Sequence, residues 1–101
     1  MTAKTEAKRR AQIHKIINLC LDINGIQETN QRCTGSRPTA FFRFSGHVGM
    51  MDIDVSPHGY CAREHKENWN FSVCEEDDTE ILRCIRDLKE IKAGMQHEEM
   101  E

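Results

Sequence analysis

The chain has 101 residues, of which 38% are hydrophobic and 31% charged, and a net charge of −3. This length suits a single domain with its own core, and this composition excludes a disordered chain. No apolar run reaches the roughly 18 residues that a membrane span needs, and the polar, basic N-terminus lacks the apolar core of a signal peptide. We therefore expect one cytoplasmic domain over residues 1–101, with frayed tails at 1–3 and 96–101.

The first predicted element is a helix from Lys4 to Asn24, which the pair Asn24-Gly25 ends because glycine readily takes the left-handed conformation of a helix stop. Apolar residues at a spacing of three and four predict its buried stripe: Ile13, Ile16, Ile17, Cys20 and Leu21. The basic run Lys8-Arg9-Arg10 is expected on the solvated face. A nucleic-acid partner is not expected, because the protein is acidic overall and this helix carries no aromatic residue.

Three strands are predicted after a polar loop over residues 26–38. Alternating apolar residues place them at Thr39–Ser45, Met51–Val55 and Trp69–Val73, with turns at 46–49 and 56–59 and a polar stretch at 63–68. Every second residue faces the same side of a sheet. The side expected to face the core holds Ala40, Phe42, Phe44, Met51, Ile53, Val55, Trp69, Phe71 and Val73.

A second helix is predicted to begin at Asp77, whose carboxyl group and that of Glu80 have the spacing of a capping box, and to end at Gly94. Its buried stripe is Ile81, Cys84, Ile85, Leu88 and Ile91. The predicted fold class is α+β, with the two-layer order α-β-β-β-α: a three-stranded antiparallel sheet with two helices packed on one face.

The outer face of this sheet has no predicted element left to cover it. It is expected to hold Phe41, Arg43, Met50, Asp52, Asp54, Asn70 and Ser72. Apolar side chains within a polar rim are typical of a protein-binding surface. We therefore predict that a protein partner or a second copy binds there, through Phe41, Arg43, His47, Met50, Asp52 and Asp54.

A small-ligand or metal site on the same face is the alternative function, with acid/base catalysis as a further possibility. Asp52 and Asp54 point to one side, and His47 and His58 lie near the two ends of their strand. We instead expect Arg43, across the hairpin, to pair with one of the carboxylates, and His47 to be a turn residue. The sequence thus predicts no enzyme, no cofactor and no metal.

The five cysteines are expected to be reduced, since their number is odd and no C-x-x-C pair occurs. Cys20 and Cys84 lie on the apolar faces of the two helices, which favours burial. A zinc site built from Cys33, Cys61, His65 and Cys74 stays an open alternative. It is disfavoured because paired ligands in a tight turn are missing.

The most distinctive stretch is Phe44-Ser45-Gly46-His47-Val48, followed by the acidic alternating run 51–55. Over about residues 39–60 it resembles a hairpin of small uncharacterised phage or prophage proteins. The resemblance carries over no catalytic residue, and it implies a protein that binds and inhibits or redirects a host protein. The expected function is therefore a small non-enzymatic protein-interaction module, and the resemblance implies a phage- or prophage-encoded regulator or inhibitor of a host protein.

Overall fold

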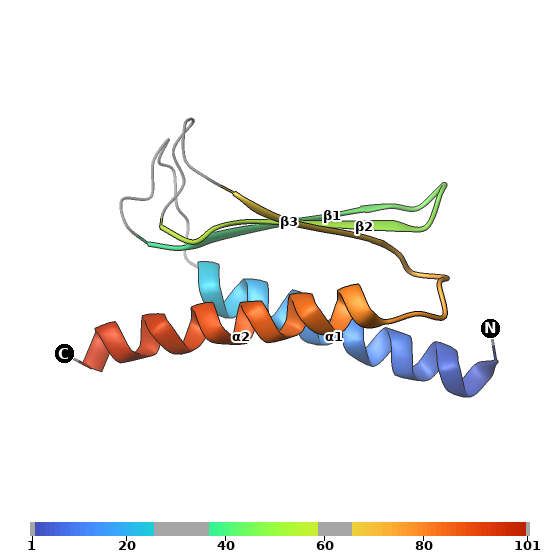
Figure 1. The fold of residues 1–101 in the computed structure, drawn as a ribbon, viewed down its shortest axis with the longest axis horizontal. Coiled ribbons are helices and arrows are strands. Elements are labelled where there is room, and N and C mark those ends of the chain that lie inside the picture. Colours follow the sequence, from blue (N-terminus) through green and yellow to red (C-terminus); the bar gives the residue numbers. More distant parts are fainter. Residues whose placement is uncertain (1, 26–36, 59–65, 101) are drawn as a thin grey trace.

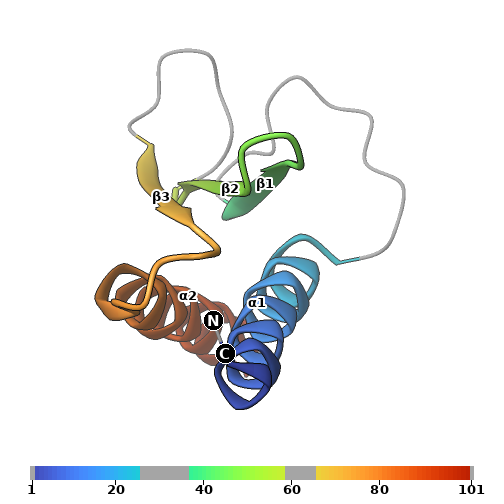
Figure 2. The same cartoon turned by 90° about the vertical axis from the view of Figure 1, so that its right-hand side faces the viewer.

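The computed structural model describes residues 2–25, 37–58 and 66–100, and it confirms the α-β-β-β-α order. The elements are α1 (Ala3–Asn24), β1 (Thr39–Ser45), β2 (Met50–Ser56), β3 (Glu67–Ser72) and α2 (Thr79–Met100). The three strands form an antiparallel sheet in the order β1-β2-β3, and both helices lie on one side of it (Figures 1 and 2). Neither helix has an apolar stretch long enough to cross a membrane in its described part.

Helix α1 begins and ends where local chemistry dictates. The Thr2 hydroxyl accepts a hydrogen bond from the backbone N–H of Thr5 and caps the first turn. At the other end Gly25 has a φ of 74°, and its N–H donates to the carbonyl of Leu21. A residue with a side chain would be strained in that conformation, which confirms the predicted helix stop.

The buried stripe of α1 is rotated from the one predicted. The buried residues are Arg9, Ile16, Leu19, Cys20 and Ile23. Leu21, which was expected in the core, is exposed, and Ile13 and Ile17 are only partly buried. Arg9, which was expected in solvent, is almost fully buried. Both stripes satisfy the helical period, so the angle at which the helix meets the sheet decides between them.

Helix α2 begins at Thr79. The Asp77 carboxylate accepts hydrogen bonds from the backbone N–H and the hydroxyl of Thr79 at this end of the helix. The Glu80 carboxylate pairs with Arg83, so the predicted capping box is not what holds this end. The helix also runs past Gly94 to Met100, and the predicted stop there is wrong. Glycine costs a helix interior only about 1 kcal/mol, which the neighbouring turns tolerate.

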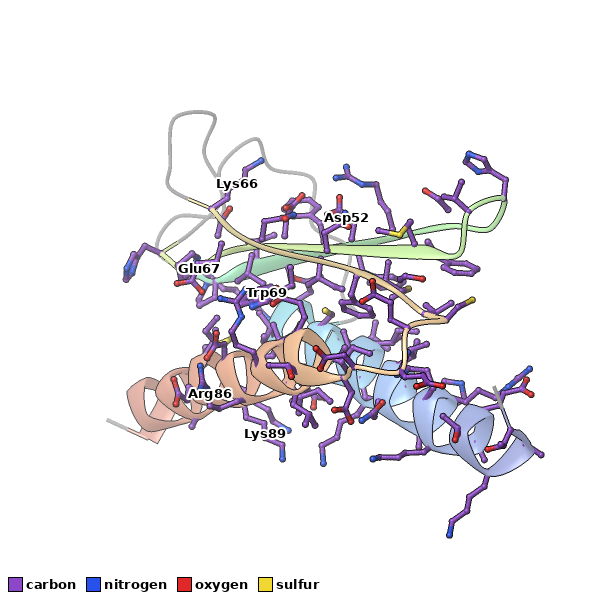
Figure 3. All side chains as sticks on the ribbon, turned by 45° about the vertical axis from the view of Figure 1, so that its right-hand side comes forward. Asp52, Lys66, Glu67, Trp69, Arg86 and Lys89 are labelled. Atoms are coloured by element: carbon purple, nitrogen blue, oxygen red, sulfur yellow. The ribbon has the colours of Figure 1, made fainter. Side chains whose placement is uncertain are left out.

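The core lies between the sheet and the two helices, and it contains most of the residues predicted for it. Figure 3 shows Trp69 pointing from β3 toward α2. Burial raises the pKa of the Cys20 thiol to about 11 and that of the Cys84 thiol to about 12, so both are inert side chains of the core as predicted. The fully or nearly fully buried apolar residues are Ile16, Leu19, Cys20, Ile23, Ala40, Met51, Ile53, Val55, Trp69, Phe71, Ile81, Cys84, Ile85 and Leu88.

Two strand predictions need correction. Strand β3 covers Glu67–Ser72, so it takes in the last residues of the stretch expected to be a loop and ends before Val73. Phe42 and Phe44, predicted for the core, are exposed. They are on the predicted side of the sheet, because the register pairs them with the buried residues Ile53 and Met51. They are exposed because α1 does not pack closely against this end of β1.

Candidate functional site: the open edge of strand β1

Strand β1 forms one edge of the sheet and carries three exposed phenylalanines. The exposed fractions of Phe41, Phe42 and Phe44 are 38%, 42% and 58%. Ala40 is the only buried residue of the strand. In the described part of the chain, three other large apolar side chains are as exposed as these: Leu21, Val48 and Leu82. Half of the exposed large apolar side chains of the described residues therefore lie on one edge strand.

The way α1 meets the sheet explains this exposure. Figure 1 shows the C-terminal end of α1 close to the sheet and its N-terminal half sloping away from it. The close approach occurs at Ala40, whose small side chain permits it, and Asn24 hydrogen-bonds to the backbone there. Farther along β1 the bulkier Phe42 and Phe44 come opposite the part of α1 that has already diverged. The helix consequently covers one end of the strand and leaves the other open.

The space between the diverging elements is a largely apolar groove with a volume of about 540 Å³. It is lined by Ile13 and Ile17 of α1, by Phe42 and Phe44 of β1, and by Met51, Val73 and Cys74. Glu6, Arg9 and Arg10 line it at the N-terminal end of α1. An apolar groove beside an edge strand combines two properties of peptide-binding surfaces.

Arg9 fixes one end of this groove. Its guanidinium donates to the carbonyl of Val73 at 2.7 Å and to that of Glu75 at 2.5 Å, and its Nε donates to Gln12 at 3.1 Å. These bonds tie α1 to the segment that follows β3. They also satisfy a charged group that would otherwise be costly to bury.

On the edge of β1 that faces away from β2, the backbone groups of Ala40 have a partner in the described part of the chain. The Asn24 side chain donates to the carbonyl of Ala40 at 2.8 Å and accepts from its N–H at 2.7 Å. Both groups of Ala40 therefore point away from β2. Because this direction alternates along an antiparallel strand, the N–H and C=O groups of Phe42 and Phe44 also point to the open edge. Within the described residues nothing hydrogen-bonds to them there.

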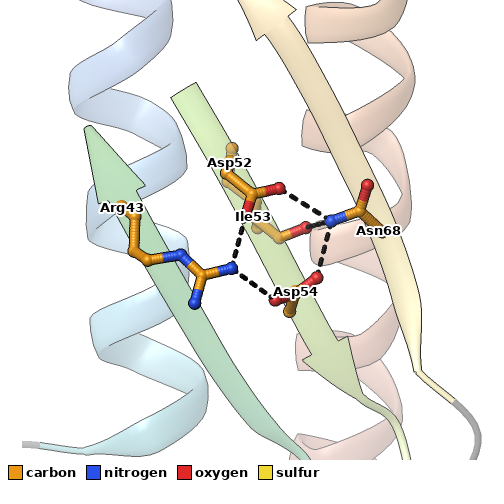
Figure 4. Close-up of polar contacts among 5 residues, drawn as sticks. All are labelled: Arg43, Asp52, Ile53, Asp54 and Asn68. Carbon is orange, nitrogen blue, oxygen red and sulfur yellow. Dashed lines mark hydrogen bonds and ion pairs between the residues drawn. The ribbon is translucent and has the colours of Figure 1, made fainter. Parts of the chain in front are cut away.

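The predicted binding residues of the outer face lie on the opposite side of the sheet. Arg43 donates to Asp52 at 2.5 Å and to Asp54 at 3.3 Å, and Figure 4 shows its guanidinium directed to both carboxylates. The other oxygens of the two carboxylates accept from Asn68, at 2.8 Å and 2.6 Å. The Arg43 and Asn68 hydrogen bonds lower the pKa of Asp52. This quartet extends the expected single ion pair and leaves the carboxylates engaged by neighbours.

The remaining predicted site residues are dispersed over that face. Phe41 lies under the ammonium group of Lys66, 5.8 Å from the ring centroid, and Met50 is half-buried at the start of β2. His47 is exposed in the turn between β1 and β2, where Gly49 adopts a φ of 65°. His58 follows the far end of β2. A strand of seven residues separates the two histidines by about 20 Å, too far to share a ligand.

The described residues do not provide the arrangement of ligands that the two metal-site alternatives require. Within residues 2–25, 37–58 and 66–100, no group of three or more His, Cys, Asp or Glu side chains is placed to hold a metal ion. Of the zinc set, Cys74 is exposed beside the groove, whereas Cys33, Cys61 and His65 lie outside the described residues.

A second hollow, of about 720 Å³, lies between the helices, and its lining includes the basic residues His14, Lys15, Lys89 and Lys92 beside apolar residues such as Leu19. Figure 3 shows Lys89 pointing away from the sheet. The neighbouring Lys15 lowers the pKa of Lys89, and Lys92 is paired with Asp22 at 2.8 Å. His14, Lys15 and Lys89 are exposed surface side chains, so the β1 edge is the better-defined site.

Comparison with protein families, with curated proteins and with solved structures finds no match for this chain. The geometry of the β1 edge is therefore what points to a function. Sequence analysis placed Phe42 and Phe44 in the core and missed this edge. The signal that could have found it is Ala40, since a small residue among three phenylalanines marks where a helix can approach.

Proposed function

We propose that this protein is a small non-enzymatic interaction module that binds another polypeptide along strand β1. The observation that carries the proposal is the set of three exposed phenylalanines on a strand whose outer backbone groups, beyond Ala40, have no hydrogen-bond partner within residues 2–25, 37–58 and 66–100. Addition of a strand to such an edge gives affinity through backbone hydrogen bonds and specificity through side-chain pockets. Here the apolar groove beside Phe42 and Phe44 would serve as the pocket.

The composition of β1 supports this proposal. Natural proteins protect sheet edges with lysine, proline, bulges or a covering element. Strand β1 reads Thr-Ala-Phe-Phe-Arg-Phe-Ser and pairs with β2 without interruption, so it has none of the first three. Its single charge, on Arg43, is directed to Asp52 and Asp54. An edge left in this state is suited to pairing with another strand.

The resemblance of residues 39–60 to small phage and prophage proteins supports a host protein among the chains bound, and a regulatory or inhibitory role toward it. Free thiols at Cys20 and Cys84 suit the reducing cytoplasm where such a protein would act.

The proposal is tested by co-purification with two matched variants. Tagged wild-type protein, tagged Phe44→Asp and tagged Leu82→Asp are each expressed in cells together with an untagged copy of the same protein. Every polypeptide that co-purifies with the tagged protein is identified. Leu82 is the control because its exposed fraction, 50%, is close to that of Phe44, but it lies on α2. Wild type and Leu82→Asp should retain the same bound chains, and Phe44→Asp should lose them. Equal retention by all three proteins would contradict the proposal.

A further inference from the structure

We infer that the polypeptide that pairs with β1 is a second copy of this protein, so that two sheets join by antiparallel β1–β1 pairing into one continuous sheet. This inference rests on the proposed function, because it names the chain that occupies the edge. Three features carry it: the stretch of β1 that is open, the order of the residues in that stretch, and the groove beside it.

The open stretch is short and sharply bounded. Asn24 already occupies the backbone groups of Ala40, and beyond Ser45 the chain turns toward β2. The outward-pointing groups that remain on the strand belong to Phe42 and Phe44. In an antiparallel pair the residues that exchange two hydrogen bonds stand opposite each other. Phe42 of each copy opposite Phe44 of the other forms two such pairs, and these four bonds use the groups that are open and leave the Asn24 bonds intact.

The residue order of the open stretch is self-complementary. Phe42-Arg43-Phe44 reads the same in both directions, so a two-fold axis between the Arg43 residues sets apolar residues opposite apolar ones. A register centred on Phe42 would instead require the backbone groups of Ala40, which are taken. A register centred on Phe44 would set Phe42 opposite the turn residue Gly46. The register centred on Arg43 is therefore the one that the edge favours.

The side chains of the pair suit both faces of the joined sheet. On the helix side, Phe44 of each copy lies beside Phe42 of the other, at the open side of the groove lined by Ile13 and Ile17. Aromatic side chains opposite each other are favourable in this position, and water is excluded from the groove. On the outer face the two Arg43 residues meet, and like charges directly opposite normally repel. Here each guanidinium is drawn to two carboxylates of its own β2, which outweigh its charge.

The first test is the mass in solution together with a cysteine cross-link. Arg43 faces its own copy at a non-hydrogen-bonded position, where Cα atoms are about 4.5 Å apart and a disulfide forms readily. Arg43→Cys should therefore give a covalent dimer of twice 11.7 kDa under mild oxidation. Ser45→Cys is the matched control on the same face, since the two copies of residue 45 would lie roughly 13 Å apart. The wild-type chain, oxidised in parallel, reports any cross-link through the native thiols.

The inference predicts that wild-type protein is a dimer, that Phe44→Asp is a folded monomer, and that Arg43→Cys cross-links at least tenfold faster than Ser45→Cys. A dimer that survives Phe44→Asp, or equal cross-linking at positions 43 and 45, would overturn it. Suppose that the wild-type protein is monomeric and binds a different polypeptide, which Phe44→Asp no longer binds. This result would overturn the inference that the partner is a second copy and would leave the proposed function standing. A monomeric wild-type protein whose bound chains are unaffected by Phe44→Asp would overturn both.

Discussion

The two edges of the sheet show the same sequence pattern, but the aromatic side chains of one edge are buried and those of the other are exposed. On the helix side, β3 presents Trp69 and Phe71, and β1 presents Phe42 and Phe44. The exposed fractions of the β3 pair are 2% and 4%, whereas those of the β1 pair are 42% and 58%. The difference lies in the helices: α2 runs beneath β3, whereas α1 is close to the sheet at its C-terminal end and slopes away from it toward its N-terminus (Figures 1 and 2). Asn24, at the close end, bonds to the backbone of Ala40.

Alternation in a strand specifies which face of the sheet a side chain takes, but not whether another element covers that face. Phe42, Ile53 and Trp69 form one row across the three strands. Two members of this row are buried, and the third is the one at the β1 edge. A single-strand pattern contains no information about the tilt of a helix in the other layer. The edge that this tilt leaves open is the one we propose as the binding site.

The largest effect that separates the two edges should appear in truncation to alanine. Trp69→Ala should lower the free energy of unfolding by about 3–5 kcal/mol, because it leaves a cavity in the core. Phe42→Ala should cost about 1 kcal/mol in the monomer, since much of its ring is already in water. Chemical denaturation at a concentration that holds only monomer measures both. Equal costs at the two positions would mean that β1 is covered like β3.

Arg9 should account for the next largest effect, because it holds α1 to the segment after β3. Arg9→Met should lower the free energy of unfolding by about 2–3 kcal/mol through loss of the charged hydrogen bonds to Val73 and Glu75. Arg10→Met is the control, since Arg10 is exposed and forms a surface pair with Glu6, and it should cost less than about 0.5 kcal/mol. If thermal denaturation ranks the two variants equally, Arg9 is solvated as the sequence alone suggested.

Asn24 should contribute less, and its removal should lengthen the open edge. Asn24→Ala should cost about 1–2 kcal/mol, because the N–H and C=O groups of Ala40 lose their partners. Asn18→Ala on the exposed side of the same helix should have little effect. Amide hydrogen exchange should also show faster exchange at Ala40 in Asn24→Ala alone. Unchanged protection at Ala40 would contradict its assignment to the open side of β1.

The smallest effect concerns the outer face, where Arg43 hydrogen-bonds to Asp52 and, with Asn68, lowers its pKa from the ordinary 3.8. A carboxylate whose pKa is lowered by folding adds stability above its unfolded-state pKa, and this is lost as the pH falls through the folded-state pKa. Arg43→Ala should raise the Asp52 pKa toward 3.8 and flatten the loss of stability below pH ~4. An NMR titration of the side-chain carboxyl carbon measures this. A midpoint that does not move would show that Arg43 makes no lasting bond.

Much of the fold was predictable from local patterns. The alternation at Ile53, Val55, Trp69 and Phe71 identified the strands and their buried side, and Asn24-Gly25 marked the end of α1. These signals are local, because strand period and helix stops depend on neighbouring residues. The pairing of Arg43 with the aspartates was also predictable, since it follows from the register of one hairpin.

What the sequence could not predict depends on contacts between distant segments. Arg9 hydrogen-bonds to the carbonyl of Val73, more than sixty residues away in the sequence. The side-chain amide of Asn24 hydrogen-bonds to Ala40 of β1, sixteen residues away. Leu21 and Leu19 fit the helical period equally well, so the angle of α1 alone decided which was buried. The exposure of Phe42 and Phe44 follows from that same angle.

Native-state amide hydrogen exchange at Phe42 and Phe44, followed as a function of protein concentration, tests most directly whether the β1 edge is open and self-pairing. The N–H groups of Phe41 and Arg43 point to β2 and should be protected at every concentration. The N–H groups of Phe42 and Phe44 should exchange rapidly in dilute protein and become protected as dimers form. Protection of both amides in dilute, monomeric protein would show that the chain already satisfies this edge, and it would contradict the account.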